Sequence, residues 1–272
     1  MPRINDKYME IAGYLAALLI GVSLGLIGGG GSILTIPVLV YLFNIPPTLA
    51  TGYSLFIVGC SSLAGAWKNY RRGNINFRAA GYFGITSIIT VVLIRKFVVP
   101  EIPEHLFRIG SFTVTKPLAT MVLFAIVMIL ASLNMIQKPV SDKGQDQGQP
   151  IDFPKAMIRG IEVGILTGLL GAGGGFVIIP VLIFSFHLHM KKAIGTSLLI
   201  IAMNSLSGFA GDLFHQQFDW WLLLPLTAIA VTGVFIGRRL GQDLSGERLK
   251  KWFGWFVLVM GIYIIIHEVF VK

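Results

Sequence analysis

The chain has 272 residues, of which 54% are hydrophobic and only 13% are charged, and its formal charge at pH 7 is +9. These charged side chains are too few to cover a water-soluble globule of this size. Lipid must therefore be the solvent for most of the chain. The Lys and Arg residues lie in short clusters between apolar runs. This arrangement indicates membrane topology, and it does not suggest a nucleic-acid partner.

Long uncharged stretches predict the membrane segments. The residues from Ile11 to Trp67 include no Asp, Glu, Lys, Arg or His. Further uncharged runs follow in chain order at Ala79–Ile94, Pro117–Gln137, Val163–Phe186, Ala193–Gly211, Trp220–Gly237 and Trp252–Ile266. Most are long enough to cross a hydrocarbon core of about 30 Å. We therefore predict an all-α integral membrane protein with about eight full spans and short broken or re-entrant helices, up to about ten segments in all.

An internal repeat organises these segments. When the chain is shifted by 143 residues, Gly21–Val40 aligns with Gly164–Ile183, and ten of the twenty pairs are identical. The match continues from Ala50–Leu55 onto Ala193–Leu198. We therefore divide the chain into a first membrane repeat (1–137), a cytoplasmic linker (138–154) and a second membrane repeat (155–272).

The distribution of positive charge favours five segments in each repeat over four. With four segments, the 22 Lys and Arg residues divide into 11 on each side of the membrane. With five segments, one side collects 15 and the other 7, which satisfies the positive-inside rule with both termini outside. The loop Lys68–Arg78 is strongly basic, whereas its repeat partner Gly211–Trp221 has no Lys or Arg. An odd number of segments inverts the second repeat, which is a common plan of secondary transporters.

A run of small residues in each repeat is the motif most relevant to function. The runs are Gly28-Gly29-Gly30-Gly31-Ser32 and Gly171-Ala172-Gly173-Gly174-Gly175. Because a glycine costs about 1 kcal/mol in a helix interior, we predict that the helix breaks at each run. A new helix beginning near Ser32 or Phe176 would direct free N–H groups and its positive dipole end into the protein, where an anion could bind. The alternative is that the glycines only allow close helix packing.

Hydroxyl and amide side chains on apolar helices provide further neutral donors. Ser54 and Ser197 occupy equivalent positions in the two repeats. For each such residue, a bond within its own helix or to a neighbouring helix is the alternative interpretation. The residues that we predict to bind substrate are Gly30, Gly31, Ser32, Ser54, Gly173, Gly174, Gly175, Thr196, Ser197 and Asn204.

Ionisable side chains are expected near the membrane ends. Glu162 and Asp212 fall there, and three histidines fall in predicted loops, namely His187, His189 and His215. We therefore expect no buried proton relay, no catalytic residue, no metal and no cofactor. The clusters Arg71-Arg72 and Arg238-Arg239 are interpreted as topology anchors, with a second interpretation as collectors of anions at the cytoplasmic mouth.

The duplicated motif resembles the sulfite exporter TauE/SafE family of bacterial membrane transporters. The resemblance is carried by Gly21–Leu39 and Gly164–Leu182, each followed by a short segment, Ala50–Ser54 or Ala193–Ser197. It implies a multi-pass protein of the bacterial inner membrane that exports sulfite or organosulfonates. The first copy departs from the second at Ser32, where the second has Gly175, and at Tyr53, where the second has Thr196.

The predicted function is secondary transport of a small anion. We expect export of sulfite or a related sulfur-containing or organosulfonate anion, and the alternatives are an anion channel or a carrier for a non-sulfur small anion. A membrane-embedded enzyme would need an intramembrane group of His, Asp or Glu, and the sequence does not suggest one. The expected partners are the anion and the lipid bilayer, and the oligomeric state, a homodimer included, stays open.

Overall fold

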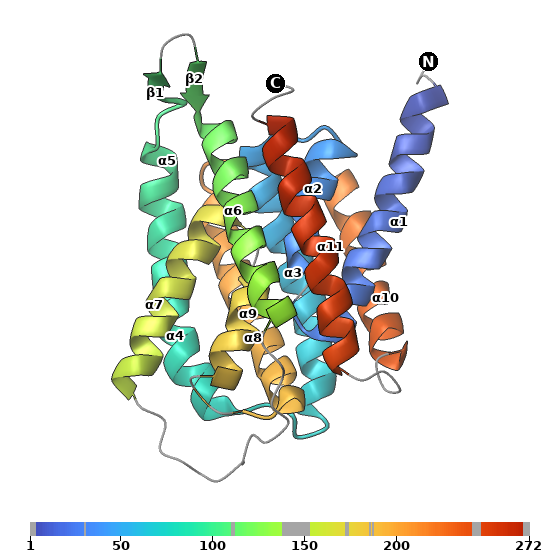
Figure 1. Cartoon of the computed structure of the whole chain (residues 1–272), viewed down its shortest axis with the longest axis vertical. Coiled ribbons are helices and arrows are strands. Elements are labelled where there is room, and N and C mark those ends of the chain that lie inside the picture. Colours follow the sequence, from blue (N-terminus) through green and yellow to red (C-terminus); the bar gives the residue numbers. More distant parts are fainter. Residues whose placement is uncertain are drawn as a thin grey trace.

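The computed structural model describes residues 4–29, 31–109, 112–137, 153–171, 174–184, 186, 188–240 and 246–268. Within these ranges the chain forms a bundle of helices that run between two ends (Figure 1). In the first half they are α1 (Ile4–Ile27), α2 (Ser32–Tyr41), α3 (Pro47–Tyr70), α4 (Phe77–Leu93), the π-helical η1 (Ile94–Val98), α5 (Val99–Glu101) and α6 (Lys116–Gln137). In the second half they are α7 (Phe153–Leu170), α8 (Gly175–Phe184), α9 (Met190–Asp212), α10 (Trp220–Leu240) and α11 (Gly246–Ile266).

The helices have the length and surface of membrane segments. Five stretches of the described chain are long and apolar enough to cross a bilayer, at Pro47–Tyr70, Phe77–Glu101, Lys116–Asn134, Lys191–Asp212 and Trp220–Leu240. Large apolar side chains such as Leu19 and Val259 are more than half exposed on the bundle. A soluble protein rarely exposes such a surface, so the prediction of a helical membrane protein is confirmed.

Each predicted helix break lies where the glycine run indicated it. The helix α1 ends at Ile27 and α2 begins at Ser32, and in the second half α7 ends at Leu170 and α8 begins at Gly175. Both α2 and α8 contain ten residues. Such a helix is about 15 Å long, which is half of what a full crossing requires. The prediction of two short helices is therefore confirmed.

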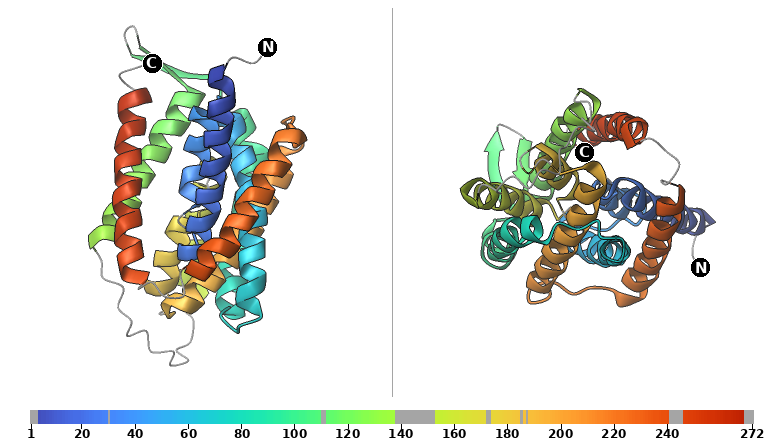
Figure 2. Two further views of the ribbon diagram at one scale, coloured as in Figure 1. Left: turned by 90° about the vertical axis from the view of Figure 1, so that its right-hand side faces the viewer. Right: turned by 90° about the horizontal axis from the view of Figure 1, so that it is seen from below.

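The two halves pack against each other through equivalent helix pairs. The helix α1 lies along α10, and α7 lies along α4, so the first long helix of each half packs against the third long helix of the other. The helix α3 lies along α9, and α6 lies along α11 (Figure 2). Exchanging the halves therefore reproduces the same set of contacts. Figure 1 also shows that α1 and α7 run in opposite directions along the bundle.

Glycines bring the α1–α10 and α4–α7 pairs into close contact. A Cβ atom at Gly21 would collide with the carbonyl oxygen of Ala230, and one at Gly164 would lie 2.8 Å from the carbonyl oxygen of Ser87. Ser87 and Ala230 are 143 residues apart, as are the two glycines. Gly21 and Gly164 therefore serve close helix packing, which was the alternative interpretation of the glycines. The helix breaks lie at the later glycine runs that begin at Gly28 and Gly171.

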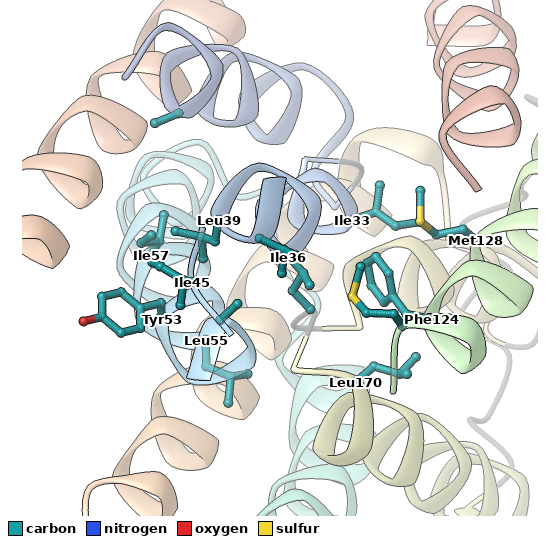
Figure 3. Close-up of a cluster of buried hydrophobic side chains, with 14 of the residues drawn as sticks. Ile33, Ile36, Leu39, Ile45, Tyr53, Leu55, Ile57, Phe124, Met128 and Leu170 are labelled. Carbon is teal, nitrogen blue, oxygen red and sulfur yellow. The ribbon is translucent and has the colours of Figure 1, made fainter. Parts of the chain in front are cut away.

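A buried apolar cluster holds α2 in the bundle. Ile33 and Ile36 of α2 lie between Leu55 of α3 on one side and Phe124 and Met128 of α6 on the other (Figure 3). The two isoleucines are 1% exposed or less. Burial of such side chains contributes on the order of 2 kcal/mol each relative to exposure in water, and in lipid the benefit comes mainly from close packing.

The sequence analysis predicted neither the π-helical η1 nor a β-hairpin that follows it. The strands β1 (His105–Ile109) and β2 (Phe112–Thr115) pair antiparallel between α5 and α6. They extend from the end of the bundle at which α1 begins and α11 ends (Figure 1). The other boundary difference is small: Phe153 and Pro154, assigned to the linker, belong to α7, and residues 138–152 lie outside the described residues.

We expect Gly21→Ala to destabilise the protein by about 1–3 kcal/mol, because the new methyl group pushes the α1 and α10 backbones apart. Thermal unfolding in detergent measures the effect. Gly81→Ala is the control, because a Cβ there meets nothing within 4 Å and alanine favours the helix. Equal melting temperatures for the two variants would contradict the close-packing assignment.

Candidate anion-binding site

Two glycine turns, one in each half, lie at the ends of α1 and α7. Gly28 has a φ of 79° and Gly171 a φ of 67°, a conformation that favours glycine. The N–H of Gly28 donates to the Leu24 carbonyl at 2.8 Å, and the N–H of Gly171 donates to the Thr167 carbonyl at 2.9 Å. These bonds terminate both helices in the same way, so the chain turns and begins a short helix.

The two turns meet at the contact between the halves. A Cβ at Gly29 would collide with the carbonyl oxygen of Gly175, the first residue of α8. Gly28 lies against Ile194 of α9, and Gly171 lies against Thr51 of α3, which is the residue equivalent to Ile194. The N-terminal ends of α2 and α8 therefore approach one another inside the bundle. Their positive dipole ends favour negative charge at this position.

The glycines inside the turns are closely packed. A Cβ at Gly31 would collide with the Ile20 carbonyl, and a Cβ at Gly174, which has a φ of 66°, would collide with the Thr167 hydroxyl. Ser32 donates its hydroxyl to the Gly29 carbonyl at 2.8 Å. These residues fold each turn back onto its preceding helix. The other predicted turn residues, Gly30 and Gly173, lie outside the described residues.

Ser197 lies on the first turn, and Ser54 is its buried counterpart in the other half. The Ser197 hydroxyl is 2.9 Å from the carbonyl oxygens of both Gly28 and Ile194, so it joins α9 to the first turn. Ser54 is fully buried at the equivalent position of α3, and its hydroxyl has no hydrogen-bond partner among the described residues. The structure therefore brings one predicted hydroxyl onto a turn and leaves its counterpart available.

Thr196 and Asn204 connect neighbouring helices. The Thr196 hydroxyl accepts a bond from the Asn76 N–H at 2.9 Å, at the start of α4. The Asn204 amide Nδ2 is 2.6 Å from the Ser87 hydroxyl of α4, and its Oδ1 has no partner among the described residues. Thr196 therefore stabilises the backbone just before α4, while Asn204 Oδ1 can still accept a hydrogen bond.

A buried ion pair was missed by the sequence analysis. Arg95 of η1 donates from Nη1 to Asp212 Oδ2 at 2.8 Å and to Thr51 Oγ1 at 3.0 Å. Arg95 is 1% exposed and Asp212 is 2% exposed. Asp212 does lie at the end of a membrane-length stretch, as expected, but it is buried and paired with Arg95, which the sequence analysis did not predict. Glu162, by contrast, forms an exposed pair with Arg159 at 2.8 Å.

Arg95 lies between a cavity and the second glycine turn. Its Nη2 approaches Gly171 so closely that a Cβ there would collide with it. It also lines a cavity of about 620 Å³, which we call the Arg95 cavity. Glu104, His105 and Thr115, from the hairpin region, border this cavity. The polar side chains Lys116, Asp212, His215 and Gln216 line it as well.

A smaller cavity lies at the other end of the bundle. This Arg238 cavity has a volume of about 340 Å³ and is lined by Gly25, Leu26, Asn69, Arg72, Asn74, Lys191, Ile194 and Arg238. Nη1 of Arg238 is buried and has no hydrogen-bond partner among the described residues. The cavity reaches the first glycine turn, because Ile194 contacts Gly28.

The two cavities are built from equivalent residues. In the repeat alignment, which shifts the chain by 143 residues, Arg95 of the first cavity corresponds to Arg238 of the second, and Asp212 corresponds to Asn69. Likewise Thr48 and His215 of the Arg95 cavity correspond to Lys191 and Arg72 of the Arg238 cavity. Each cavity therefore contains an arginine near a glycine turn. Extending the repeat alignment beyond Gly65 to these positions would have identified both arginines as candidate residues.

The bundle, its broken helices and its arginine-lined cavities are those of a multi-pass membrane transporter. The chain belongs to the Sulfite exporter TauE/SafE family, which matches residues 13–264. A "probable membrane transporter protein" of Xylella fastidiosa is 29% identical over 252 residues, covering 91% of each chain. The Bacillus subtilis protein YdhB, with the same description, is 28% identical over 87% of this chain and 92% of its own.

The similarity extends to archaea. A "probable membrane transporter protein" of Methanocaldococcus jannaschii is 27% identical over 270 residues, covering 93% of this chain and 94% of its own. No solved structure matches the chain.

We expect Gly171→Ala to destabilise the protein by about 2–4 kcal/mol, because it adds a collision with Arg95 and Thr51 to the cost of a positive φ. Gly73→Ala is a matched control: Gly73 has a φ of 69°, but a Cβ there meets nothing within 4 Å. Its expected cost is about 1 kcal/mol. If thermal unfolding in detergent gave the same shift for both variants, the close approach of Arg95 to this turn would be disproved.

Proposed function

We propose that the chain is a secondary carrier that exports a small anion, sulfite or a related sulfur-containing or organosulfonate anion, across the bacterial inner membrane. The observation that carries this proposal is the approach of the N-terminal ends of α2 and α8, where Gly29 contacts Gly175. Two converging positive dipole ends, with the neutral hydroxyl of Ser197 on the first turn, suit an anion that is held weakly enough to be released.

We propose further that the halves are inverted repeats with about eight full spans and with both termini in the periplasm. The opposite directions of α1 and α7 and the exchange-equivalent helix contacts support the inversion. The hydrogen bonds also repeat: the Asn76 N–H donates to Thr196, and the equivalent Asp219 N–H donates to Tyr53 at 2.6 Å.

A carrier is favoured over a channel because the closely packed turns separate the two cavities. The Arg95 cavity reaches Gly171 through Arg95, and the Arg238 cavity reaches Gly28 through Ile194. Between them, Gly29 and Gly175 are in backbone contact. An anion therefore needs a rearrangement of the halves to pass, which is the behaviour of alternating access.

Cysteine accessibility tests the proposed topology. In a Cys60→Ser background, Arg71→Cys and Lys143→Cys should react with an impermeant maleimide only after the inner membrane is opened, while Phe214→Cys should react in intact spheroplasts. Arg71 and Phe214 are exposed in loops at opposite ends of the bundle. Labelling of positions 71 and 143 from opposite sides would contradict the inverted arrangement.

Flux measurements in proteoliposomes test the carrier and its energy source. We expect flux that saturates with sulfite concentration and follows an imposed potassium–valinomycin potential without an obligatory pH gradient, because the potential alone provides about 2.3 kcal/mol per charge per 100 mV. Thiosulfate, sulfate, sulfoacetate, taurine and chloride define the substrate class. Flux without saturation would favour a channel, and flux that ignored the potential but followed the pH gradient would exclude uniport.

A further inference from the structure

The two equivalent cavities differ in charge. In the Arg95 cavity two cations face two carboxylates, namely Arg95 and Lys116 against Glu104 and Asp212. The described residues that line the Arg238 cavity include three cations and no carboxylate, the cations being Arg72, Lys191 and Arg238. Counted over Lys, Arg, Asp and Glu, the first lining is balanced and the second carries three positive charges, so the second concentrates anions.

One of the exchanges between the halves that make this difference lies beside the arginines. Asp212, which pairs with Arg95 at 2.8 Å, stands where the other half has Asn69. Asn69 donates its amide to the Gly65 carbonyl at 3.0 Å and carries no charge. Arg95 therefore has an anionic neighbour from the protein itself, whereas Arg238 has a neutral amide at the equivalent position.

Arg95 also retains donors for a second anion. Its Nη1 is occupied by Asp212 and Thr51, but Nε and Nη2 are buried and have no hydrogen-bond partner among the described residues. Nε and Nη2 form the side of the guanidinium that binds two oxygens of one oxyanion. Buried donors without partners are costly, so an oxyanion that reaches them through the cavity would be stabilised.

We propose that Arg95 and Arg238 each bind a small oxyanion, such as sulfite or a sulfonate group, and that Asp212 competes with this anion for Arg95. This inference rests on the proposed carrier function. The anion is captured at Arg238, where the described lining residues include no competing carboxylate. It is released at Arg95, where Asp212 takes up the guanidinium charge as the anion leaves. Under the proposed topology the Arg238 cavity faces the cytoplasm, so the asymmetry suits loading from the cytoplasm and release on the other side, while the membrane potential sets the net direction.

Sided transport measurements test this assignment. Uptake of radiolabelled sulfite is measured in inside-out vesicles, which present the Arg238 cavity, and in right-side-out vesicles, which present the Arg95 cavity. Asn69→Asp should raise the half-saturating concentration about tenfold in inside-out vesicles only. Asp212→Asn should lower it about tenfold in right-side-out vesicles only. Glu162→Gln is the control, because it removes an exposed carboxylate outside both cavities.

Asp212→Asn leaves Arg95 without its buried counter-ion and can prevent folding. The folding of each variant is therefore checked by size-exclusion chromatography in detergent. Arg238→Gln provides a second test at a partly exposed residue. We expect it to raise the half-saturating sulfite concentration about tenfold in inside-out vesicles. If wild-type vesicles transport no oxyanion, the proposed function fails. If they transport sulfite but folded Asn69→Asp and Arg238→Gln leave the half-saturating concentration unchanged, or shift it equally on both faces, the arginine assignment is overturned.

Discussion

The requirement that every backbone polar group in lipid be satisfied determines the rest of this structure. A helix can stop inside a membrane only where protein covers its free ends. Here α1 and α7 both stop early, and the opposite half covers each end: α9 lies over Gly28, and α3 lies over Gly171. Neither half can therefore form its turn alone, and the broken helices depend on the contact between halves.

This mutual dependence also determines where the two turns lie. Because each turn is covered by the other half, the free ends of α2 and α8 lie at the boundary between the halves and not inside either one. A relative movement of the halves must then change the surroundings of both turns together. The hydrogen bonds from Asn76 to Thr196 and from Asp219 to Tyr53 cross the same boundary, so they connect the movement of one half to the loops of the other.

The sequence was sufficient for features whose cause is local. A run of glycines breaks a helix wherever it occurs, so the breaks before Ser32 and Gly175 could be located without tertiary information. The Arg95–Asp212 pair could not be found in this way, because 117 residues separate its members and each lies at the end of an apolar run. The hairpin escaped notice because strands of five and four residues are too short to stand out beside long apolar segments.

The roles of the hydroxyl groups could not be predicted from the sequence either. Thr196 and Ser197 are neighbours on one helix, yet one accepts a bond from a loop N–H and the other lies on a glycine turn. Residue type could not separate these two roles, since a hydroxyl both donates and accepts. Only the position of the opposing backbone decides which role each residue takes.

The β1–β2 hairpin has a consequence for how this architecture diversifies. Residues of the transmembrane segments must stay apolar or be paired, but a hairpin that extends beyond the ends of the helices is free of that demand. His105 and Thr115, at its two ends, border the Arg95 cavity, whereas helix ends and the loop between α3 and α4 build the Arg238 cavity. The rim of the first cavity can therefore change its polarity, size and charge by substitution or insertion while the helices keep their packing. Proteins with this architecture can thus acquire different rims at the Arg95 cavity on one unchanged helical frame.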